Sequence, residues 1–162
     1  MIPIEPAEWA RQRQIRLRAL AESPGAFGAS LASEQAQPDS FWKKRATRNP
    51  DRKMWSARVE DEWIGLVGAV RLPGGQIELV SMWVEPGWRR QGVARALIEA
   101  VVGWHRQFGG AELLLWVSED SPGARRCYER EGFRLTGLRL PLPSEPPRDR
   151  LEMRYSDPRS GQ

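Results

Sequence analysis

Six consecutive residues in the middle of the chain have the composition of a phosphate-binding loop: Arg89-Arg90-Gln91-Gly92-Val93-Ala94. The segment before them, residues 79–84, is mostly apolar, and the apolar residues after them recur at helical spacing. A strand therefore leads into a turn that opens a helix. The first backbone amides of a helix lack partners within it and lie at the positive end of its dipole, so this turn can hold phosphate oxygens.

The residue types in the turn favour a phosphorylated ligand. Gly92 and Ala94 are small enough for the backbone to approach the ligand closely. Charged donors come from Arg89, Arg90 and Arg95. Other phosphate motifs are missing, because the sequence contains neither Gly-x-Gly-x-x-Gly nor Gly-Lys-Ser/Thr. The alternative is an ordinary strand-to-helix turn with solvated arginines.

The same turn resembles the acetyl-CoA signature of the GNAT superfamily of N-acetyltransferases, Arg/Gln-x-x-Gly-x-Gly/Ala, matched by Arg89, Gly92 and Ala94. Residues 82–86 are similar to the family's strand exit, and residues 128–133 to its later Tyr-x-x-x-Gly-Phe element. The resemblance covers residues 64–133. It implies an α+β fold, a three-layer α/β/α sandwich around a mixed, mostly antiparallel sheet with a splayed central strand pair. It also implies acetyl-CoA as co-substrate.

Acetyl transfer from a thioester to an amine needs a proton donor for the departing thiolate, and Tyr128 is the candidate. Its phenol, with an ordinary pKa of about 10, stays protonated at neutral pH, whereas a thiol has a pKa of about 8.5. In the family, the tyrosine that matches Tyr128 is often the general acid. The alternative is a half-buried tyrosine that packs its ring and exposes its hydroxyl.

An alkylammonium group must lose a proton before it can attack, and Glu78 is the candidate base. It stands fourteen residues before Gly92, the spacing at which some family members carry a strand glutamate with this role. Strand alternation points Glu78 away from its apolar neighbours Ile77 and Leu79. If that side faces solvent, Glu78 is an ordinary surface residue, and the sequence leaves both interpretations open.

The resemblance also implies which residues hold the coenzyme. Backbone groups of Met82, Trp83 and Val84 would pair with its pantetheine arm as an added strand does, and would polarise the acetyl carbonyl. The pyrophosphate would lie on the turn and its amides, at Arg89, Arg90, Gln91, Gly92, Val93, Ala94 and Arg95. Ser121 stands where the family commonly has asparagine, so it either contacts the pantetheine arm or caps the helix that follows.

The single cysteine, Cys127, allows no internal disulfide, and no Cys/His cluster has the spacing of metal ligands, so no metal is expected. Consecutive helical positions differ by about 100°, which prevents Cys127 and Tyr128 from facing the same thioester. We interpret Cys127 as a packing residue and the transfer as a direct attack. His105 has no neighbouring nucleophile and is interpreted as structural.

The hydropathy pattern predicts the elements that position these residues. Strands are expected at residues 2–4, 54–59, 63–72, 76–84, 111–117, 133–140 and 151–155. Helices are expected at residues 6–23, 31–36, 38–48 and 93–108, and from Ser121-Pro122 to Gly132. In the first helix, Trp9, Leu17 and Leu20 share a face from which Ile15 is excluded.

The acceptor amine is the least determined part of the prediction. In the family, two loops line its site, and here they correspond to residues 24–28 and 141–147, which carry few charges. Four aromatic residues could form an apolar wall for an aromatic or aliphatic amine: Phe27, Phe41, Trp42 and Trp83. A core role is the alternative for each of them.

Composition limits the remaining possibilities. The chain has 162 residues, 40% of them hydrophobic, which fits one domain spanning residues 1–162. It has neither a long apolar run nor a signal-peptide pattern, so a cytoplasmic protein without a membrane partner is expected. The net charge of +4 suits an anionic coenzyme, and the 25 basic residues are dispersed among 21 acidic ones, so no nucleic-acid partner is expected.

Three functions remain to be compared. The first is an N-acetyltransferase that acts on a small-molecule or peptide primary amine, as a monomer or homodimer. The second is a catalytically silent acyl-CoA-binding or interaction module. The third is a basic nucleic-acid-binding domain, which steep salt dependence would reveal.

Overall fold

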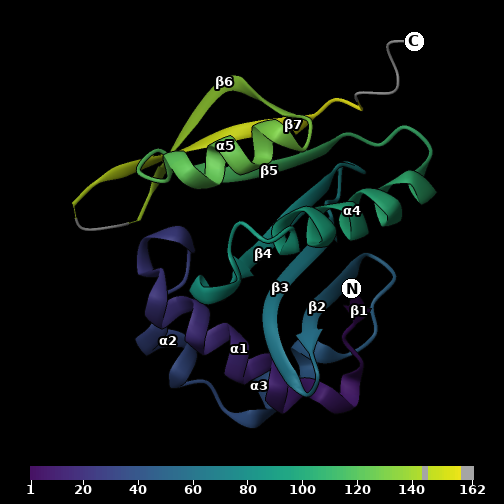
Figure 1. The fold of residues 1–162 in the computed structure, drawn as a ribbon, viewed down its shortest axis with the longest axis vertical. Helices are drawn as coiled ribbons and strands as arrows, with labels where there is room; N and C mark the ends of the chain where they lie inside the picture. The colour runs from purple at the N-terminus through teal and green to yellow at the C-terminus, as the bar shows by residue number, and fades with distance from the viewer. Residues whose placement is uncertain (144–145, 158–162) are drawn as a thin grey trace.

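The computed structural model describes residues 1–143 and 146–157, which form a seven-stranded sheet with helices on both faces (Figure 1). The strands are β1 (Ile2–Pro3), β2 (Arg52–Val59), β3 (Glu62–Arg71), β4 (Ile77–Val84), β5 (Leu113–Ser118), β6 (Phe133–Leu142) and β7 (Arg148–Tyr155). The α-helices are α1 (Trp9–Glu22), α2 (Leu31–Gln35), α3 (Asp39–Ala46), α4 (Val93–His105) and α5 (Pro122–Arg130). Short 3-10 helices flank them: η1 (Pro6–Glu8), η2 (Pro24–Ala26), η3 (Pro86–Trp88) and η4 (Arg106–Phe108). The predicted order of strands and helices is confirmed.

The strand order across the sheet is β1-β2-β3-β4-β5-β7-β6. Only β4 and β5 run parallel among the neighbouring strands of the described chain, so the sheet is mixed and mostly antiparallel, as predicted. Their pairing begins at Ile77 with Leu113 and ends at Leu79 with Leu115. Beyond Leu79 the two strands separate, which confirms the predicted splayed pair. The edge of β4 that faces β5 is therefore unpaired from Val80 onward.

A β-bulge lies in β4 at the point of separation. Leu66 of β3 pairs with Trp83, whereas Gly68 pairs with Val80, so β4 carries one extra residue between these pairs. Ser81 lies in the bulge with φ of 56°, in the left-handed region. This conformation costs an L-residue about 1–2 kcal/mol, so surrounding contacts must hold it.

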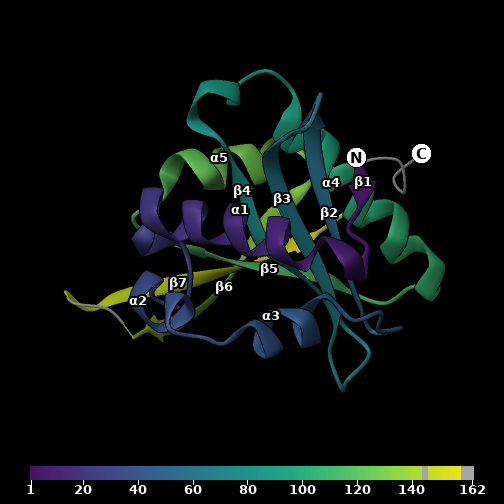
Figure 2. The same ribbon diagram turned by 90° about the horizontal axis from the view of Figure 1, so that it is seen from below.

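One face of the sheet is covered by α1, with α2 and α3 beside it (Figure 2). Ile15 and Ala19 of α1 pack in a core cluster with Met54, Trp63, Leu66 and Trp83 from the strands. The predicted face of this helix is wrong. Its buried residues are Gln12, Ile15, Arg16, Ala19 and Leu20, while Trp9 and Leu17 are only half-buried. Two polar residues on the buried face, Gln12 and Arg16, break the apolar pattern that the prediction used.

The opposite face carries α4 and α5 over the larger core cluster. Leu97, Ile98 and Val101 of α4 are fully buried there. At Gly65 of β3, an added Cβ would lie 3.0 Å from Leu97 Cδ1, so the missing side chain lets α4 pack closely on the strand. This packing fixes the start of α4 against the end of β4.

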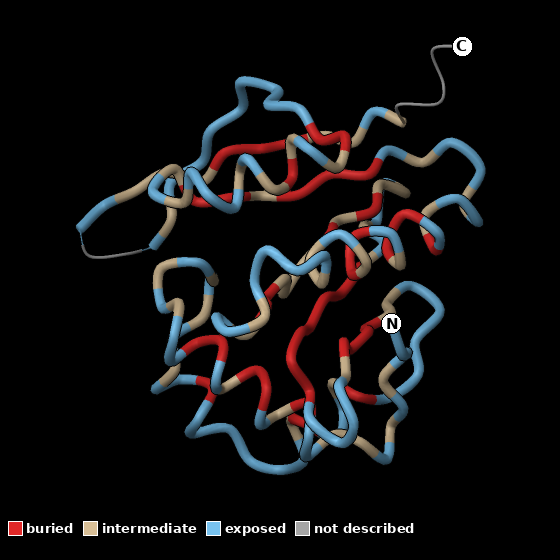
Figure 3. The backbone as a smooth tube through the Cα atoms, viewed as in Figure 1, coloured by how far each residue is buried: buried red, intermediate tan, exposed pale blue. Residues whose placement is uncertain are grey.

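Burial is highest along the central strands and low along the two outer strands, β1 and β6 (Figure 3). After the buried Phe133, the side chains of β6 are exposed up to Pro141, because β6 is the outer strand of the sheet. The parts of β4 and β5 that separate lie in the interior of the sheet. Groups that line the gap between them are thereby held by a packed core.

Candidate active site

A cavity of about 210 Å³ lies where β4 and β5 separate. Both predicted catalytic residues, Glu78 of β4 and Tyr128 of α5, line it together with Met82. The other lining residues are Arg16, Ala26, Phe27, Gly28, Leu79, Val80, Ser81, Trp116, Ser118, Leu142 and Arg150. The fold therefore brings a carboxyl group and a phenol to one cavity, although they are fifty residues apart in the sequence.

Tyr128 is buried, at 8% exposure, and its ring packs edge-on against Phe133 with 5.9 Å between ring centroids. Its hydroxyl forms no hydrogen bond with residues 1–143 or 146–157. Burial, with a smaller contribution from neighbouring Cys127, raises the pKa of the phenol above its ordinary value. The proton is therefore retained at neutral pH and is free for a ligand in the cavity.

Glu78 is half-buried on the side of β4 opposite to Ile77 and Leu79, which are buried in the larger core. The predicted alternation is therefore confirmed, and the side chain faces the cavity rather than open solvent. Burial raises the pKa of its carboxyl group, and the positive charge of Arg150 offsets part of this rise. A carboxylate with a raised pKa is a better base than an ordinary surface glutamate.

The predicted phosphate-binding turn lies between η3 and α4. Gly92 is the N-cap of α4, with φ of 83° in the left-handed region, and an added Cβ would meet no atom within 4 Å. The first hydrogen bond at this end of α4 runs from the Ala96 amide to the Gly92 carbonyl, at 3.1 Å. The amides of Val93, Ala94 and Arg95 therefore have no acceptor within their own helix.

The side chain of Arg89 already has partners within the protein. Its Nε donates to the Val84 carbonyl at 2.9 Å and its Nη2 donates to Glu22 Oε2 at 2.7 Å, so its side chain fastens the turn to β4 and α1. Burial alone would raise the pKa of the Glu22 carboxyl, but hydrogen bonds outweigh it and lower the pKa to about 2; they come from Ser23, Arg89 and Trp83. Arg89 thus holds the turn in place.

The side chains of Arg90, Gln91 and Arg95 are exposed, whereas Val93 and Ala94 pack against the larger core. Gln91 Nε2 donates to the Gly87 carbonyl at 2.9 Å, and Arg95 Nε donates to Glu99 at 3.0 Å. Arg90 has φ of 61° and, within the described ranges, no ion pair. Arg90 is therefore the arginine of the turn with an uncommitted charge, whereas the turn's main donors are backbone amides.

Met82, Trp83 and Val84 lie on the separated part of β4, where no residue of β5 pairs with them; the Val84 carbonyl accepts from Arg89 Nε at 2.9 Å. The side chain of Trp83 points into the smaller core, and its Nε1 donates to Glu22 at 2.9 Å. The predicted aromatic wall is accordingly wrong for Trp83. It is also wrong for Phe41 and Trp42, which pack together on α3 away from the cavity. Phe27 does line the cavity.

Three further predictions concern α5 and its surroundings. Ser121 is the N-cap residue that precedes α5, but its side chain makes no capping hydrogen bond and does not line the cavity. Cys127 packs against the larger core outside the cavity lining, and burial raises the pKa of its thiol. His105 Nε2 contacts the Ala111 carbonyl at 2.5 Å, which agrees with a structural role.

The two predicted acceptor loops meet beside the cavity. A neighbouring cavity of about 540 Å³ shares Phe27, Gly28 and Leu142 with it, and is further lined by residues of both loops. Residues 144 and 145 of the second loop lie outside the described residues. The loop is shorter than predicted, because β6 continues to Leu142 and β7 begins at Arg148.

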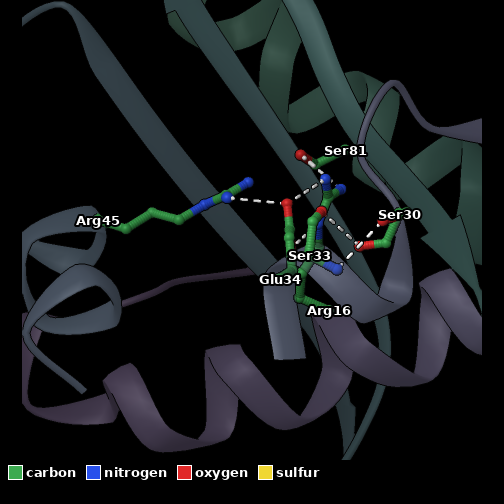
Figure 4. A network of polar contacts seen from close by, with 6 residues as sticks. All are labelled: Arg16, Ser30, Ser33, Glu34, Arg45 and Ser81. Carbon is green, nitrogen blue, oxygen red and sulfur yellow. Dashed lines mark hydrogen bonds and ion pairs between the residues drawn. The ribbon is translucent and has the colours of Figure 1, made fainter. Parts of the chain in front are cut away.

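A buried polar network supports the β4 bulge and was not predicted (Figure 4). Arg16 donates from Nε and Nη2 to Glu34, at 3.0 Å each, and from Nη1 to Ser81 Oγ at 3.3 Å. Arg45 donates to the same carboxylate at 3.3 Å. The sequence carries no local signal for this network, because its members come from α1, α2, α3 and β4.

Two features of the described ranges concern metal binding and membrane spans. Within residues 1–143 and 146–157, no three His, Cys, Asp or Glu side chains gather in a way that could hold a metal ion. In the same ranges, no helix has the length and apolar composition needed to cross a membrane.

Comparison with known proteins decides the family. Residues 21–133 match the model of the Acetyltransferase (GNAT) family. The chain belongs to the GNAT family. Among curated relatives, human N-acetyltransferase 8 is 32% identical over 88 residues, covering 51% of this chain and 39% of that protein. An uncharacterised N-acetyltransferase of Mycobacterium tuberculosis is 28% identical over 91 residues, covering 56% and 58%. The chain thus spans only part of the length of these relatives.

Solved structures show the same GNAT fold. Arabidopsis thaliana NAA60 in complex with a bisubstrate analogue has a TM-score of 0.68 at 22% identity, covering 94% of both chains. A putative streptothricin acetyltransferase from Bacillus anthracis in complex with acetyl coenzyme A has a TM-score of 0.60 at 17% identity, covering 67% of this chain and 64% of that one.

Proposed function

We propose that the protein is an acetyl-CoA-dependent N-acetyltransferase that transfers the acetyl group to a primary amine by direct attack. The observation that carries the proposal is the placement of Glu78 and Tyr128 in one cavity at the separated strands, with the Tyr128 hydroxyl not hydrogen-bonded to any described residue. GNAT membership supports the same reaction class.

The residues around the gap fit the coenzyme. The amides of Val93, Ala94 and Arg95 would bind its pyrophosphate at the start of α4, with Arg90 adding charge. The open edge of β4 at Met82, Trp83 and Val84 would pair with its pantetheine arm. Bound there, acetyl-CoA supplies the thioester that donates the acetyl group.

Two side chains account for the protons of the reaction. Glu78 accepts the first proton of the acceptor ammonium and later releases it to solvent. Tyr128 donates its phenol proton to the sulfur as the carbon–sulfur bond breaks. It recovers the second proton that the nitrogen loses as the carbon–nitrogen bond of the amide forms. The net products are an N-acetylated amine, the free thiol and one proton.

Thiol release from acetyl-CoA in the presence of an amine panel tests the proposal. We expect amine-dependent release, with the N-acetyl product identified by mass. Calorimetric binding of acetyl-CoA without release for amines, amino acids, polyamines or peptide N-termini would favour the silent acyl-CoA-binding module instead.

Gly92→Glu is expected to weaken acetyl-CoA binding by at least about tenfold, because a carboxylate would stand where phosphate oxygens bind. The open space beside Gly92 leaves room for the new side chain in the free protein, but the φ of 83° strains any residue other than glycine there. Calorimetry measures the affinity. Gly137→Glu is the matched control, since Gly137 has φ of 91°, also lies in open space, and belongs to exposed β6. Equal affinities for the two variants would contradict the proposed pyrophosphate site.

Glu78→Gln is expected to lower kcat/KM at neutral pH by about 10²–10⁴-fold, the usual range for a lost general base. Because burial raises the pKa of Glu78, the activity of the unmodified protein should fall on acidification at a higher pH than the ordinary carboxyl pKa of about 4.3. The variant should lack this acidic limb. Pre-steady-state rates across pH provide the measurement, with exposed Glu62→Gln as the control. An unchanged profile in Glu78→Gln would assign the proton to a water chain.

A further inference from the structure

Arg150 is the charged residue of the cavity whose role is unassigned. Its Nε is fully buried and has no hydrogen-bond partner within the described ranges. Its guanidinium lies over the ring of Trp116, 4.8 Å from the ring centroid. A buried donor without a partner is costly and uncommon, and it indicates a site for an acceptor group.

Apart from Glu78, whose carboxyl lines the same cavity, the carboxylates near Arg150 are engaged elsewhere. Asp149 and Glu119 both accept from Arg139, at 3.0 and 2.6 Å. Glu152 accepts from Arg154 at 3.1 Å. The described chain therefore provides Arg150 with no ion pair, while Arg16, the other arginine of the cavity, is bound to Glu34.

Stacking on Trp116 makes Arg150 suited to a planar anion. An aromatic ring under the guanidinium fixes its plane and leaves its nitrogen edges available. Two parallel N–H groups then match the two oxygens of a carboxylate. β7 holds the backbone in place, because Arg150 pairs with Ser118 of β5 on the far side of the gap from β4.

Glu78 and Arg150 could bind the two ends of one ligand through their opposite charges. Both line the same cavity, and they are close enough for the charge of Arg150 to act on the Glu78 carboxyl. A ligand with an ammonium group at one end and a carboxylate at the other complements this pair. Phe27, Trp116 and Leu142 add apolar surface to the cavity, and Phe27 and Leu142 also line the neighbouring cavity.

We infer that Arg150 binds the carboxylate of the acceptor, and that the acceptor is an α-amino acid with an apolar side chain. The inference rests on the proposed function, since it identifies the amine that Glu78 deprotonates. Arg150 is a binding and specificity residue, and it takes no proton in the reaction.

Phenylalanine and phenylalaninamide, which differ only in the carboxylate, test the inference. In thiol-release assays, Arg150→Gln should lower kcat/KM for phenylalanine by about 10–100-fold, mainly through KM, because a charged hydrogen-bonded contact is lost. For the amide the value should stay within about twofold. For each substrate, the ratio of kcat/KM between the unmodified protein and Arg150→Gln is compared. The different basicities of the two amines cancel in these ratios.

Arg154→Gln is the matched control. Arg154 lies on the same strand, pairs with Glu112 and Glu152, and is outside the cavity lining. For both substrates, kcat/KM of this variant should equal that of the unmodified protein. An equal loss for phenylalanine and its amide in Arg150→Gln would show that Arg150 acts through the fold or through the Glu78 carboxyl, and would overturn the inference. Unchanged kinetics for both would overturn it as well.

Binding separates failure of the inference from failure of the proposed function. N-acetylphenylalanine and its amide are titrated into the CoA-loaded protein by calorimetry. The acid should bind about tenfold or more tightly to the unmodified protein than to Arg150→Gln, and the amide equally to both. Absence of thiol release with every amine would contradict the proposed function alone. Equal binding of the acid to both proteins would overturn the role of Arg150.

Discussion

Tyr128→Phe is expected to lower kcat by about 10²–10⁴-fold while acetyl-CoA affinity and stability are retained. The thiolate loses its proton donor, whereas the ring that packs against Phe133 remains. Since the hydroxyl has no hydrogen-bond partner within the described ranges, its removal leaves no buried group unsatisfied. Steady-state kinetics, calorimetry and thermal unfolding measure the three quantities.

The second tyrosine of the chain provides the control for this substitution. Tyr155 also packs against Phe133, with ring centroids 5.4 Å apart, but it does not line the cavity at the separated strands. Tyr155→Phe should therefore keep its turnover. Undiminished turnover in Tyr128→Phe would remove the phenol from the mechanism, and loss of both turnover and stability would show a packing role.

Glu34→Gln is expected to reduce the free energy of unfolding at neutral pH by about 3–5 kcal/mol, the range for breaking a buried ion pair. Glu34 is 5% exposed and Arg16 is 6% exposed, so neither group can turn to solvent. Without the carboxylate, the guanidinium groups of Arg16 and Arg45 repel each other in a buried setting. Urea unfolding measures the loss.

The pH dependence of this loss distinguishes an ion pair from simple packing. Burial alone would raise the pKa of Glu34, but the bonds and charges of Arg16 and Arg45 outweigh it and lower the pKa. The stabilisation is therefore present above the ordinary carboxyl pKa of about 4.3 and is lost as pH falls through the lowered pKa. The difference between the two proteins should shrink in acid.

An exposed ion pair serves as the comparison for Glu34. Glu99 pairs with Arg95 one helical turn away, and both side chains are more than half exposed. Glu99→Gln should change the stability by less than about 0.5 kcal/mol. A similarly small change for Glu34→Gln would mean that the buried network does not hold the β4 bulge.

Local rules explain what the sequence predicted. A strand, a turn with Gly92 and an amphipathic helix follow one another within a short stretch, so residues 76–108 were assigned correctly from periodicity and capping. The α5 segment was similarly recognised from Ser121-Pro122 and the tyrosine element. The family pattern added the place of Glu78, and strand alternation gave its direction.

Long-range placement explains what the sequence did not predict. Arg150 reaches the cavity because β7 lies between β5 and β6 in the sheet. The hydropathy pattern of residues 148–155 does not predict which strands are its neighbours. The buried position of Arg16 was not predicted, because a charged residue on a helix ordinarily lies on the solvent side. Arg89 matched a phosphate-binding pattern, yet its partner Glu22 comes from a distant helix.

The early end of the β4–β5 pairing at Leu79 has an energetic consequence for any extended guest. An extended ligand that lies along β4 meets backbone donors and acceptors that do not pair with β5. Its binding therefore breaks no hydrogen bond between these two strands. The gap between β4 and β5 is preorganised. The free energy needed to keep the two strands apart is offset during folding by the packing of α4 and α5. The free energy of binding at this edge is therefore not reduced by the cost of separating the two strands.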